Sequence, residues 1–301
     1  MTAEKPAADR PPVGVPSASA PSTEDDRYAV IGSPIAHSKS PAIHTAFAAQ
    51  TQQALTYGAA DVLPAELDDF VATFFADGGC GLNVTMPHKE RVFALADVAT
   101  PRASLARAAN TLSRNAEGQL VADNTDGAGL LGDLESHGVS LRQKRILFLG
   151  AGGATRGVLA AIADLTAERP KQITVANRTV AKAHALREDF SQSLALTAVG
   201  YVDLGGSSFD LIINGTSASL GGELPPLAEG LVAPGCCCYD MMYAAEPTPF
   251  QRWAQENHAT LVLDGLGMLV GQAAESFLVW RGVRPATSAV VEELRATLRI
   301  P

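Results

Sequence analysis

The sequence predicts an α/β fold made of two α/β domains with a cleft between them. Short apolar runs alternate with stretches of helical length, and repeated strand–helix units are typical of a parallel sheet covered by helices. The alternation occurs as two successive series, the second of which begins just before a glycine-rich loop at Gly150. A length of 301 residues agrees with two domains, since a single domain commonly holds about 100–200 residues.

Residues 1–26 differ in composition from the rest of the chain. They contain five of the 18 prolines and no aromatic residue, leucine or isoleucine. Such a segment buries too little apolar surface to offset the entropy lost on ordering. We therefore expect residues 1–26 to form a disordered tail.

The overall charge restricts the classes of partner. The chain has 23 Lys and Arg against 32 Asp and Glu, a net charge of −9, whereas nucleic-acid-binding proteins usually present a basic surface. No run approaches the ~18 apolar residues that a membrane-spanning helix needs, and the first residues lack the apolar core of an export signal. We expect a small-molecule substrate, no nucleic-acid or membrane partner, and a cytoplasmic location.

The first series of elements starts at Tyr28–Ile31, a short apolar run that ends at Gly32 and predicts a strand. Pro41 then favours a helix through about Gln50, because its fixed φ suits the first turn. Turn residues between two short apolar runs predict a hairpin near residues 111–122. The remaining elements in order are a strand, a helix, a strand, a helix, the two hairpin strands and a helix, at Leu55–Val62, Pro64–Phe75, Gly81–Val84, Lys89–Leu95, Thr111–Ser113, Leu120–Ala122 and Asp126–His137.

The second series has the same alternation and ends in two helices. Its predicted strands are Arg145–Leu149, Gln172–Ala176, Leu211–Ile213, Cys236–Tyr239 and Thr260–Leu263. Its predicted helices are Ala154–Leu165, Val180–Phe190, Pro247–Glu256, Met268–Trp280 and Ser288–Leu298.

The four cysteines, Cys80 and the run Cys236–Cys238, have neither the spacing of a metal site nor that of a disulfide framework. Successive side chains on a strand point to opposite faces, so the run predicts small buried apolar residues. A reactive thiol is the alternative.

The segment Gly150–Ala154 directly follows a strand and begins a helix. Gly150 and Gly152 have no side chains, so the backbone can turn tightly and approach a pyrophosphate, and the helix N-terminus supplies free N–H groups. This context is typical of a Rossmann-type dinucleotide-binding domain. Thr155 stands where the common fingerprint has a third glycine, and a structural turn in an unrelated α/β domain is the alternative.

The residues after the next strand indicate which dinucleotide is bound. An NAD site places Asp or Glu there to accept from the ribose 2′-hydroxyl, whereas this chain has Asn177-Arg178-Thr179 and then Lys182. The Arg178 guanidinium suits a phosphate, and Lys182 adds a positive charge. The sequence predicts NADP, against the alternative of a solvated basic helix start.

Two segments of the first series carry side chains suited to a small polar substrate. Ser38 and Ser40 lie just before a helix start, where paired hydroxyls suit a carboxylate, although they would equally serve as N-caps. Asn83 and Thr85 alternate at the end of a strand, and Lys89 follows at the next turn, which makes Lys89 a candidate for acid–base chemistry.

Seven ordered segments together resemble the shikimate dehydrogenase family, and the resemblance runs from about Tyr28 to the C-terminus. The segments are Pro34–Pro41, Asn83–Glu90, Ala109–Leu112, Asp123–Gly127, Gly150–Ala154, Tyr239–Tyr243 and Gly265–Gln272.

The resemblance implies a function and a set of site residues. The implied reaction is the reversible NADPH-dependent reduction of 3-dehydroshikimate to shikimate, in the pathway to aromatic amino acids. Lys89 and Asp126 would be the catalytic pair, and Ser38 and Ser40 would hold the substrate carboxylate. The other expected substrate contacts are Asn83, Thr85, Asn110, Tyr243 and Gln272. The expected cofactor contacts are Gly150, Ala151, Gly152, Gly153, Ala154, Asn177, Arg178, Thr179 and Lys182, with Met241 and Gly265 on the nicotinamide side.

The expected domains are an N-terminal substrate-binding domain, 27–125 with 265–301, and a Rossmann-type NADP-binding domain, 126–264. We expect a monomer or a homodimer, without a metal. Ser33, Thr155 and Gly215 depart from residues common in the family, and none has an expected catalytic role.

Three alternatives stay open. The chain would act on quinate as well as shikimate, or prefer NAD, or be a silent ligand-binding regulator. A serine at position 40 favours shikimate over quinate in family terms, the Arg178 segment opposes NAD, and a silent regulator would have lost Lys89 or Asp126. Of the histidines, only His88, which lies beside Lys89, is a candidate for a functional role.

Overall fold

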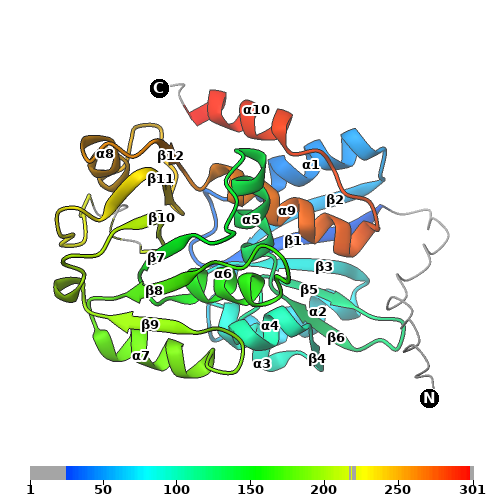
Figure 1. Cartoon of the computed structure of the whole chain (residues 1–301). Helices are drawn as coiled ribbons and strands as arrows, with labels where there is room; N and C mark the ends of the chain where they lie inside the picture. The colour runs from blue at the N-terminus through cyan, green and yellow to red at the C-terminus, as the bar shows by residue number, and fades with distance from the viewer. Residues whose placement is uncertain (1–24, 217, 219–221, 299–301) are drawn as a thin grey trace, which may run out of the picture.

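The computed structural model describes residues 25–216, 218 and 222–298. It contains two six-stranded sheets with helices packed around them (Figure 1). Residues 1–24 of the expected tail lie outside the described residues. Asp26 was expected in the tail but is the first residue of strand β1, where it pairs with Leu55 of the neighbouring strand.

The N-terminal sheet has the strand order β2-β1-β3-β5-β6-β4. Strand β1 is parallel to β2 and β3, whereas β5 is antiparallel to β3 and to β6. The sheet is therefore mixed rather than wholly parallel, because the predicted hairpin, β5–β6, is inserted between β3 and the edge strand β4. Its strands are β1 Asp26–Gly32, β2 Leu55–Asp61, β3 Gly79–Val84, β4 Val98–Ala99, β5 Thr111–Arg114 and β6 Leu120–Asp123.

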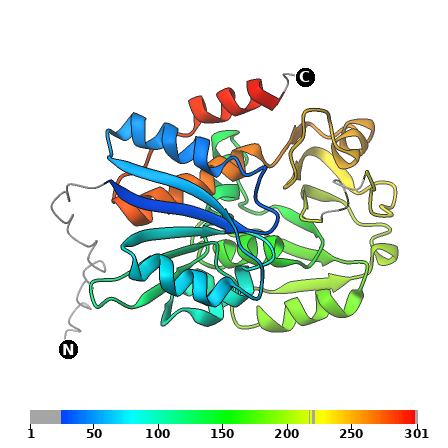
Figure 2. The same ribbon diagram turned by 180° about the vertical axis from the view of Figure 1, so that it is seen from behind.

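Helices cover both faces of this sheet, as the two opposite views show for α1 and α2 (Figures 1 and 2). One face packs against apolar residues of α2 and α3, and α1, α9 and α10 form a second cluster around Phe47 and Phe277. The helices are α1 Ser40–Thr51, α2 Leu67–Ala76, α3 Lys89–Leu95, α4 Pro101–Ala106, α9 Leu266–Arg281 and α10 Ser288–Leu298.

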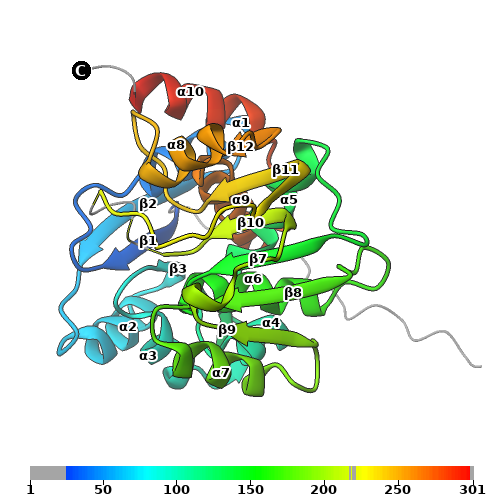
Figure 3. The same cartoon turned by 60° about the vertical axis from the view of Figure 1, so that its left-hand side comes forward.

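The C-terminal sheet is parallel throughout, with the order β12-β11-β10-β7-β8-β9 (Figure 3). Its strands are β7 Arg145–Leu149, β8 Gln172–Ala176, β9 Leu196–Val199, β10 Phe209–Asn214, β11 Val232–Asp240 and β12 Leu261–Leu263. Its helical elements are α6 Gly153–Ala163, α7 Val180–Asp189, the 3₁₀ turn η1 Tyr201–Asp203 and α8 Pro249–Glu256.

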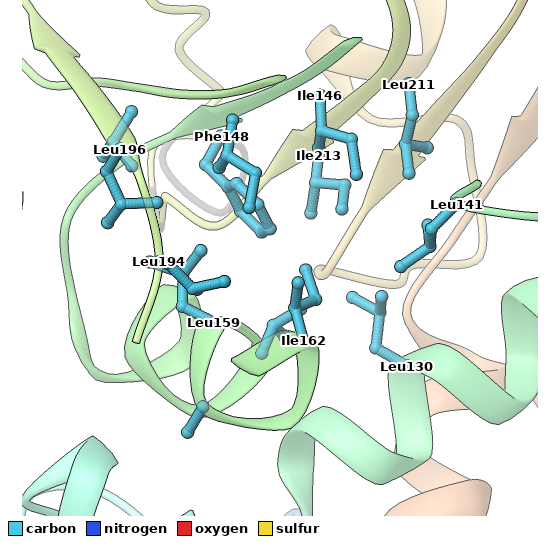
Figure 4. Packing of buried hydrophobic residues seen from close by; sticks show 14 of the residues in the cluster. Leu130, Leu141, Ile146, Phe148, Leu159, Ile162, Leu194, Leu196, Leu211 and Ile213 are labelled. Atoms are coloured by element: carbon cyan, nitrogen blue, oxygen red, sulfur yellow. The ribbon is translucent and has the colours of Figure 1, made fainter. Parts of the chain in front are cut away.

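Both faces of this sheet are buried, which is why its strands are continuous apolar runs. Along β7, Ile146 and Phe148 pack with α6 residues such as Leu159, whereas Leu147 and Leu149 pack in the cluster that contains Phe250 of α8. Figure 4 shows the first of these layers between the strands and the helices. The alternation follows from the two-residue period of a strand.

Two helices lie between the sheets, α5 Asp126–Ser136 and α9 (Figure 1). They pack closely because glycines face the opposite backbone, as at Gly129, where a Cβ would lie 2.7 Å from the carbonyl oxygen of Met268. Asp126 is the first residue of α5 and Gln272 lies on α9, so this contact brings two predicted site residues together.

Most of the predicted elements are present, and the differences have local causes. Helix α4 was not predicted; it begins at Pro101, after Thr100, whose hydroxyl accepts the N–H of Ala103. Strands β4 and β9 were not predicted either, because they are short and lie at the sheet edges. The prediction for Cys236–Cys238 is confirmed, because all three are buried within β11. Among the described residues, no helix is long and apolar enough to cross a membrane.

Candidate active site

A cavity of about 350 Å³ lies where the two halves of the chain meet, and it contains most of the predicted substrate and catalytic residues. It is lined from the N-terminal half by β1, the loop before α1, β3 and α3, and from the C-terminal half by the segment after β11 and the start of α9. The predicted residues in its lining are Ser38, Ser40, Asn83, Thr85, Lys89, Asn110, Asp126, Met241, Tyr243, Gly265 and Gln272. A larger cavity of about 930 Å³ between α5, α10 and β12 contains none of them.

Lys89 and Asp126 form an ion pair in this cavity. The Lys89 Nζ donates to Asp126 Oδ2 at 2.6 Å, and the two side chains are 24 % and 8 % exposed. Lys89 begins α3 and Asp126 begins α5, and a carboxylate at a helix N-terminus is stabilised by the helix dipole. The pair therefore places one cation and its counter-ion, mostly out of water, at the wall of the cavity.

Asn110 connects this pair to Gln272. Its Nδ2 lies 2.9 Å from Asp126 Oδ1 and 3.1 Å from Gln272 Oε1, and its Oδ1 accepts the backbone N–H of Thr125 at 2.8 Å. An amide nitrogen has only two hydrogens, and the Thr125 hydroxyl is a third acceptor at 2.9 Å. The Asn110 side chain is therefore held in place by its Oδ1. Its two Nδ2 hydrogens are shared among three acceptors, so one of these bonds can be exchanged for a bond to a ligand.

The Asn83 side chain is held by residues that the sequence analysis did not select. Its Oδ1 accepts from the Tyr57 hydroxyl at 2.7 Å, and its Nδ2 donates to Ser276 Oγ at 2.9 Å and to the Asn110 carbonyl at 3.1 Å. Burial raises the pKa of the Tyr57 phenol well above its ordinary value, so the phenol stays a donor. Ser276 follows Gln272 by four residues on α9, and this spacing is the signal that could have found it.

Ser38 and Ser40 both face the cavity, and they are not equivalent. Ser40 is buried, whereas Ser38 accepts the Ser40 N–H through its Oγ at 3.3 Å. The N-cap residue of α1 is Lys39, whose side chain makes no capping bond. The hydrogen bond from the Ser40 N–H to Ser38 Oγ is long and therefore weak. Both hydroxyls lie near the N-terminus of α1, where an anion is favoured.

The remaining residues form the other wall. Thr85 follows β3, and its methyl group occupies the space that a Cβ on Gly32 would need. A Cβ at Gly265 would clash with the Met241 carbonyl oxygen, so only glycine fits there. Tyr243 is partly buried, and burial raises the pKa of its phenol.

His88 does not point to chemistry. It is buried, and its Nε2 lies 2.7 Å from the carbonyl oxygen of Val62, which makes that nitrogen the N–H donor. The ring therefore ties the turn before Lys89 to the end of β2.

The glycine loop lies outside this cavity, between β7 and α6 of the C-terminal sheet. Gly150 has a φ of +97°, which favours glycine, and the positions of a Cβ on Gly152 and on Gly153 have no atom within 4 Å. Among the described residues, nothing therefore covers the backbone at the start of α6. Thr155 Oγ1 donates to the Gly150 carbonyl at 2.9 Å, so the threonine in place of the third glycine closes the loop from behind.

The residues after β8 fall into two groups, one hydrogen-bonded to the glycine loop and one exposed to solvent. Asn177 is tied to the glycine loop, since its Oδ1 accepts the Ala151 N–H at 3.3 Å and its Nδ2 donates to the Thr179 carbonyl at 2.9 Å. Arg178 and Lys182 are exposed, and neither side chain has a hydrogen bond or an ion pair with another residue in the described part of the chain. These residues fit a phosphate-bearing dinucleotide, because the open N-terminus of α6 lies next to the segment after β8, which carries two cations without an ion pair among the described residues, Arg178 before α7 and Lys182 in its first turn.

Comparisons with known proteins agree with this arrangement. Three family models match: the shikimate dehydrogenase substrate binding domain at residues 30–112, shikimate / quinate 5-dehydrogenase at 133–220, and the shikimate 5′-dehydrogenase C-terminal domain at 265–295. A shikimate dehydrogenase (NADP(+)) from Methylococcus capsulatus is 55 % identical over 278 residues, which cover 92 % of this chain and 99 % of the relative.

Solved structures give the same result. The Ael1 enzyme from Pseudomonas putida is 47 % identical, with a TM-score of 0.83 over 92 % of this chain and 99 % of that one. The shikimate 5-dehydrogenase from Thermus thermophilus, solved with NADP(H) and shikimate, is 33 % identical, with a TM-score of 0.79 over 91 % of this chain and 100 % of that one. Because the 55 % sequence identity to the Methylococcus capsulatus relative extends over 92 % of this chain, the chain belongs to the shikimate dehydrogenase family.

Proposed function

We propose that this chain catalyses the reversible NADPH-dependent reduction of 3-dehydroshikimate to shikimate, in the pathway to aromatic amino acids. The observation that carries the proposal is the Lys89–Asp126 ion pair, at 2.6 Å, in a cavity that residues from both halves of the chain line. Such a pair suits the reduction of a ketone, because a proton donor must stand where negative charge develops on oxygen.

Lys89 is the proposed proton donor. Its ammonium both stabilises the developing charge on the C3 oxygen and donates the proton to that oxygen, and in the reverse direction the amine takes the proton back. Asp126 orients the ammonium through Oδ2 and offers an acceptor to the neighbouring substrate hydroxyl. Asn110, bound to Oδ1, keeps the carboxylate in this orientation.

The rest of the cavity is proposed to bind the acid and the hydroxyls of the substrate. Ser38 and Ser40 would receive the carboxylate at the start of α1. The side-chain hydroxyls and amides of Thr85, Asn110 and Gln272, with Asn83 and Tyr243, supply the donors and acceptors that a polyhydroxylated ring needs.

The C-terminal half is proposed to hold NADP. The start of α6, with Gly150 to Ala154, would receive the pyrophosphate, and Arg178, Thr179 and Lys182 would receive the 2′-phosphate. Asn177 keeps these two loops together, and Met241 and Gly265 lie on the nicotinamide side. When bound, the cofactor supplies or accepts the hydride.

The two sheets support the proposed domains, since β1–β6 lie within residues 26–123 and β7–β12 within residues 145–263. We propose 27–125 with 265–301 as the substrate-binding domain and 126–264 as the NADP-binding domain, so that Asp126 lies at the junction. The thiols of Cys80 and Cys236–Cys238 are all free, as suits a reducing compartment, and we propose a cytoplasmic location and a monomer or homodimer.

The absorbance of the reduced nicotinamide tests the function. Wild-type protein with shikimate and NADP should generate this absorbance, and replacing shikimate by quinate or NADP by NAD should reduce kcat/KM strongly. Comparable turnover of quinate or NAD would favour the broader enzyme. Binding of shikimate without any turnover would identify a silent regulator and overturn the proposal.

A further inference from the structure

Arg102 of α4 is bound to two carboxylates that lie behind the cavity. Its Nε and Nη2 donate to the two oxygens of Asp123, each at 2.6 Å, and its Nη1 donates to Glu275 Oε1 at 3.0 Å. The three side chains are only 20 %, 6 % and 13 % exposed. The guanidinium therefore joins the end of β6 to α9 from within the protein.

Each of these carboxylates lies three residues from a side chain of the cavity. Asp123 precedes Asp126 by three residues, and its Oδ1 also accepts the Asn124 N–H at 2.7 Å and the Thr100 hydroxyl at 2.7 Å, which fixes the turn into α5. Glu275 follows Gln272 by three residues on α9, so the two side chains lie on neighbouring parts of one helix face.

The same two segments are also joined on the cavity side. Asn110 Nδ2 lies within 3.1 Å of both Asp126 and Gln272, and the Asn110 N–H donates to the Asp123 carbonyl at 3.0 Å. The Arg102 contacts on the side away from the cavity and the Asn110 contacts on the cavity side thus together set the distance between the turn before α5 and helix α9.

We propose that Arg102 is a positioning residue for the reaction: its guanidinium, shared between Asp123 and Glu275, sets the separation of Asp126 from Gln272. The inference rests on the proposed function, since it concerns the substrate site of that reaction. Arg102 touches neither the cavity nor its contents, so it acts through the two carboxylates.

Arginine is required for this geometry. Its planar fork binds both oxygens of Asp123 and still directs a third nitrogen to Glu275, whereas an ammonium is a point charge without a fork. Changing one member of a buried ion pair can destabilise the fold, because it leaves the remaining charge buried without its full partner. The ratio of KM to kcat and the Kd for NADP therefore test the positioning role, and the melting temperature does not.

Two variants distinguish the contact of Arg102 with Glu275 from its contact with Asp123. Glu275→Gln removes the negative charge that holds α9 to Arg102 and so weakens this contact while Arg102 keeps Asp123, and KM for shikimate should therefore rise severalfold with kcat nearly unchanged. Arg102→Lys loosens both segments, so kcat should fall as well and kcat/KM should drop roughly tenfold to a hundredfold, as misplacements of about 1 Å can produce. The Kd for NADP should stay within about twofold of wild type in both.

Two control variants test ion pairs that lack this role. Arg284→Gln removes the second, exposed ion-pair partner of Glu275. Arg91 lies on α3, the helix that carries Lys89, and Arg91→Gln removes its exposed ion pair with Asp68 of α2. Both should keep wild-type kcat and KM. Where Arg102→Lys fails to fold, Glu275→Gln decides the question by its KM and kcat.

The outcomes distinguish this inference from the function itself. Wild-type protein without turnover of shikimate overturns the proposed function, and the positioning role with it. An active wild type with wild-type kinetics in Glu275→Gln overturns only the role of Arg102, as does an equal loss of shikimate and NADP affinity in that variant.

Discussion

A Cβ on Gly129 would stand 2.5 Å from the backbone nitrogen of Gln272. No real Cβ is accommodated that close to backbone, so helices α5 and α9 approach each other only because residue 129 has no side chain. The opposite glycine, Gly271, would similarly place a Cβ 2.9 Å from the Gly129 carbonyl oxygen. The separation of the helices that carry Asp126 and Gln272 thus depends on these two glycines.

Gly129→Ala should accordingly damage the substrate site. The methyl group pushes α9 away from α5, which should cost about 1–3 kcal/mol of stability and lower kcat/KM for shikimate roughly tenfold or more. Gly132→Ala is the matched control on the same helix, since its Cβ would meet nothing within 4 Å. It should keep wild-type kinetics and gain about 0.5–1 kcal/mol. Wild-type kinetics in Gly129→Ala would show that the contact does not set the site.

Lys89→Ala should depress kcat far more than it changes KM. The ion pair with Asp126 places the ammonium in the cavity, and general acid–base catalysis contributes about 10²–10⁴-fold to a rate. Steady-state kinetics in both directions provide the measurement. Lys171→Ala, which removes an exposed lysine just before β8, should be silent. A Lys89→Ala variant that kept more than half of wild-type turnover would contradict the assignment.

Replacing both Ser38 and Ser40 with alanine should weaken substrate binding rather than chemistry. Hydrogen bonds to a charged group contribute roughly 1.5–3 kcal/mol, so KM for shikimate should rise at least tenfold. KM for NADP should change little, because the serines line the cavity whereas the glycine loop lies outside it, in the C-terminal half of the chain. Equal increases for both ligands would instead mean that the serines mainly support the start of α1.

The alternation of strands and helices, the glycine loop and the candidate Lys89 could be predicted because their signals are local, whereas Asp126, Asn110 and Gln272 were expected only from the family resemblance. A glycine loop after a strand, a proline at a helix start and a lysine beside a strand end are all visible in short segments. Ser276 and Arg102 were not predicted, because their significance comes from partners far away in the chain, such as Asn83 and Glu275. The mixed pairing of the N-terminal sheet was missed for the same reason, since the position of a hairpin within a sheet depends on tertiary contacts.

His44 should make the stability of the protein depend on pH. Its ring is fully buried and stacked on Tyr57 at 4.1 Å between centroids, and burial lowers the pKa of His44 to about 3. The unfolded chain therefore binds a proton below about pH 6.5 that the folded chain does not, so stability is lost as the pH falls, by about 1.4 kcal/mol per pH unit.

Urea unfolding near pH 7.5 and near pH 5.5 measures this effect. His44→Phe keeps a ring on Tyr57, and the Nε2 of His44 has no hydrogen-bond partner among the described residues. Between the two pH values, the free energy of unfolding of His44→Phe should fall by about 1.4 kcal/mol less than that of wild type. His184→Gln, at an exposed position of α7, should behave like wild type. An identical pH dependence in His44→Phe and wild type would refute the expectation.

Arg178→Asp should reverse the preference between cofactors. The 2′-phosphate carries close to two negative charges near neutral pH, and Arg178 stands exposed and uncommitted at the start of α7, beside the loop that Asn177 ties to the glycine turn. Loss of the guanidinium should cost roughly tenfold to a hundredfold in NADP affinity, since charged hydrogen bonds contribute about 1.5–3 kcal/mol each. The new carboxylate adds repulsion toward the phosphate and offers an acceptor to the ribose of NAD. Arg187→Asp makes the same charge change in the last turn of α7, at the opposite end of the helix that follows Arg178, and should leave both cofactors nearly unaffected. The ratio of kcat/KM for NADP to that for NAD, at saturating shikimate, decides the matter, and an unchanged ratio in Arg178→Asp would place the 2′-phosphate elsewhere.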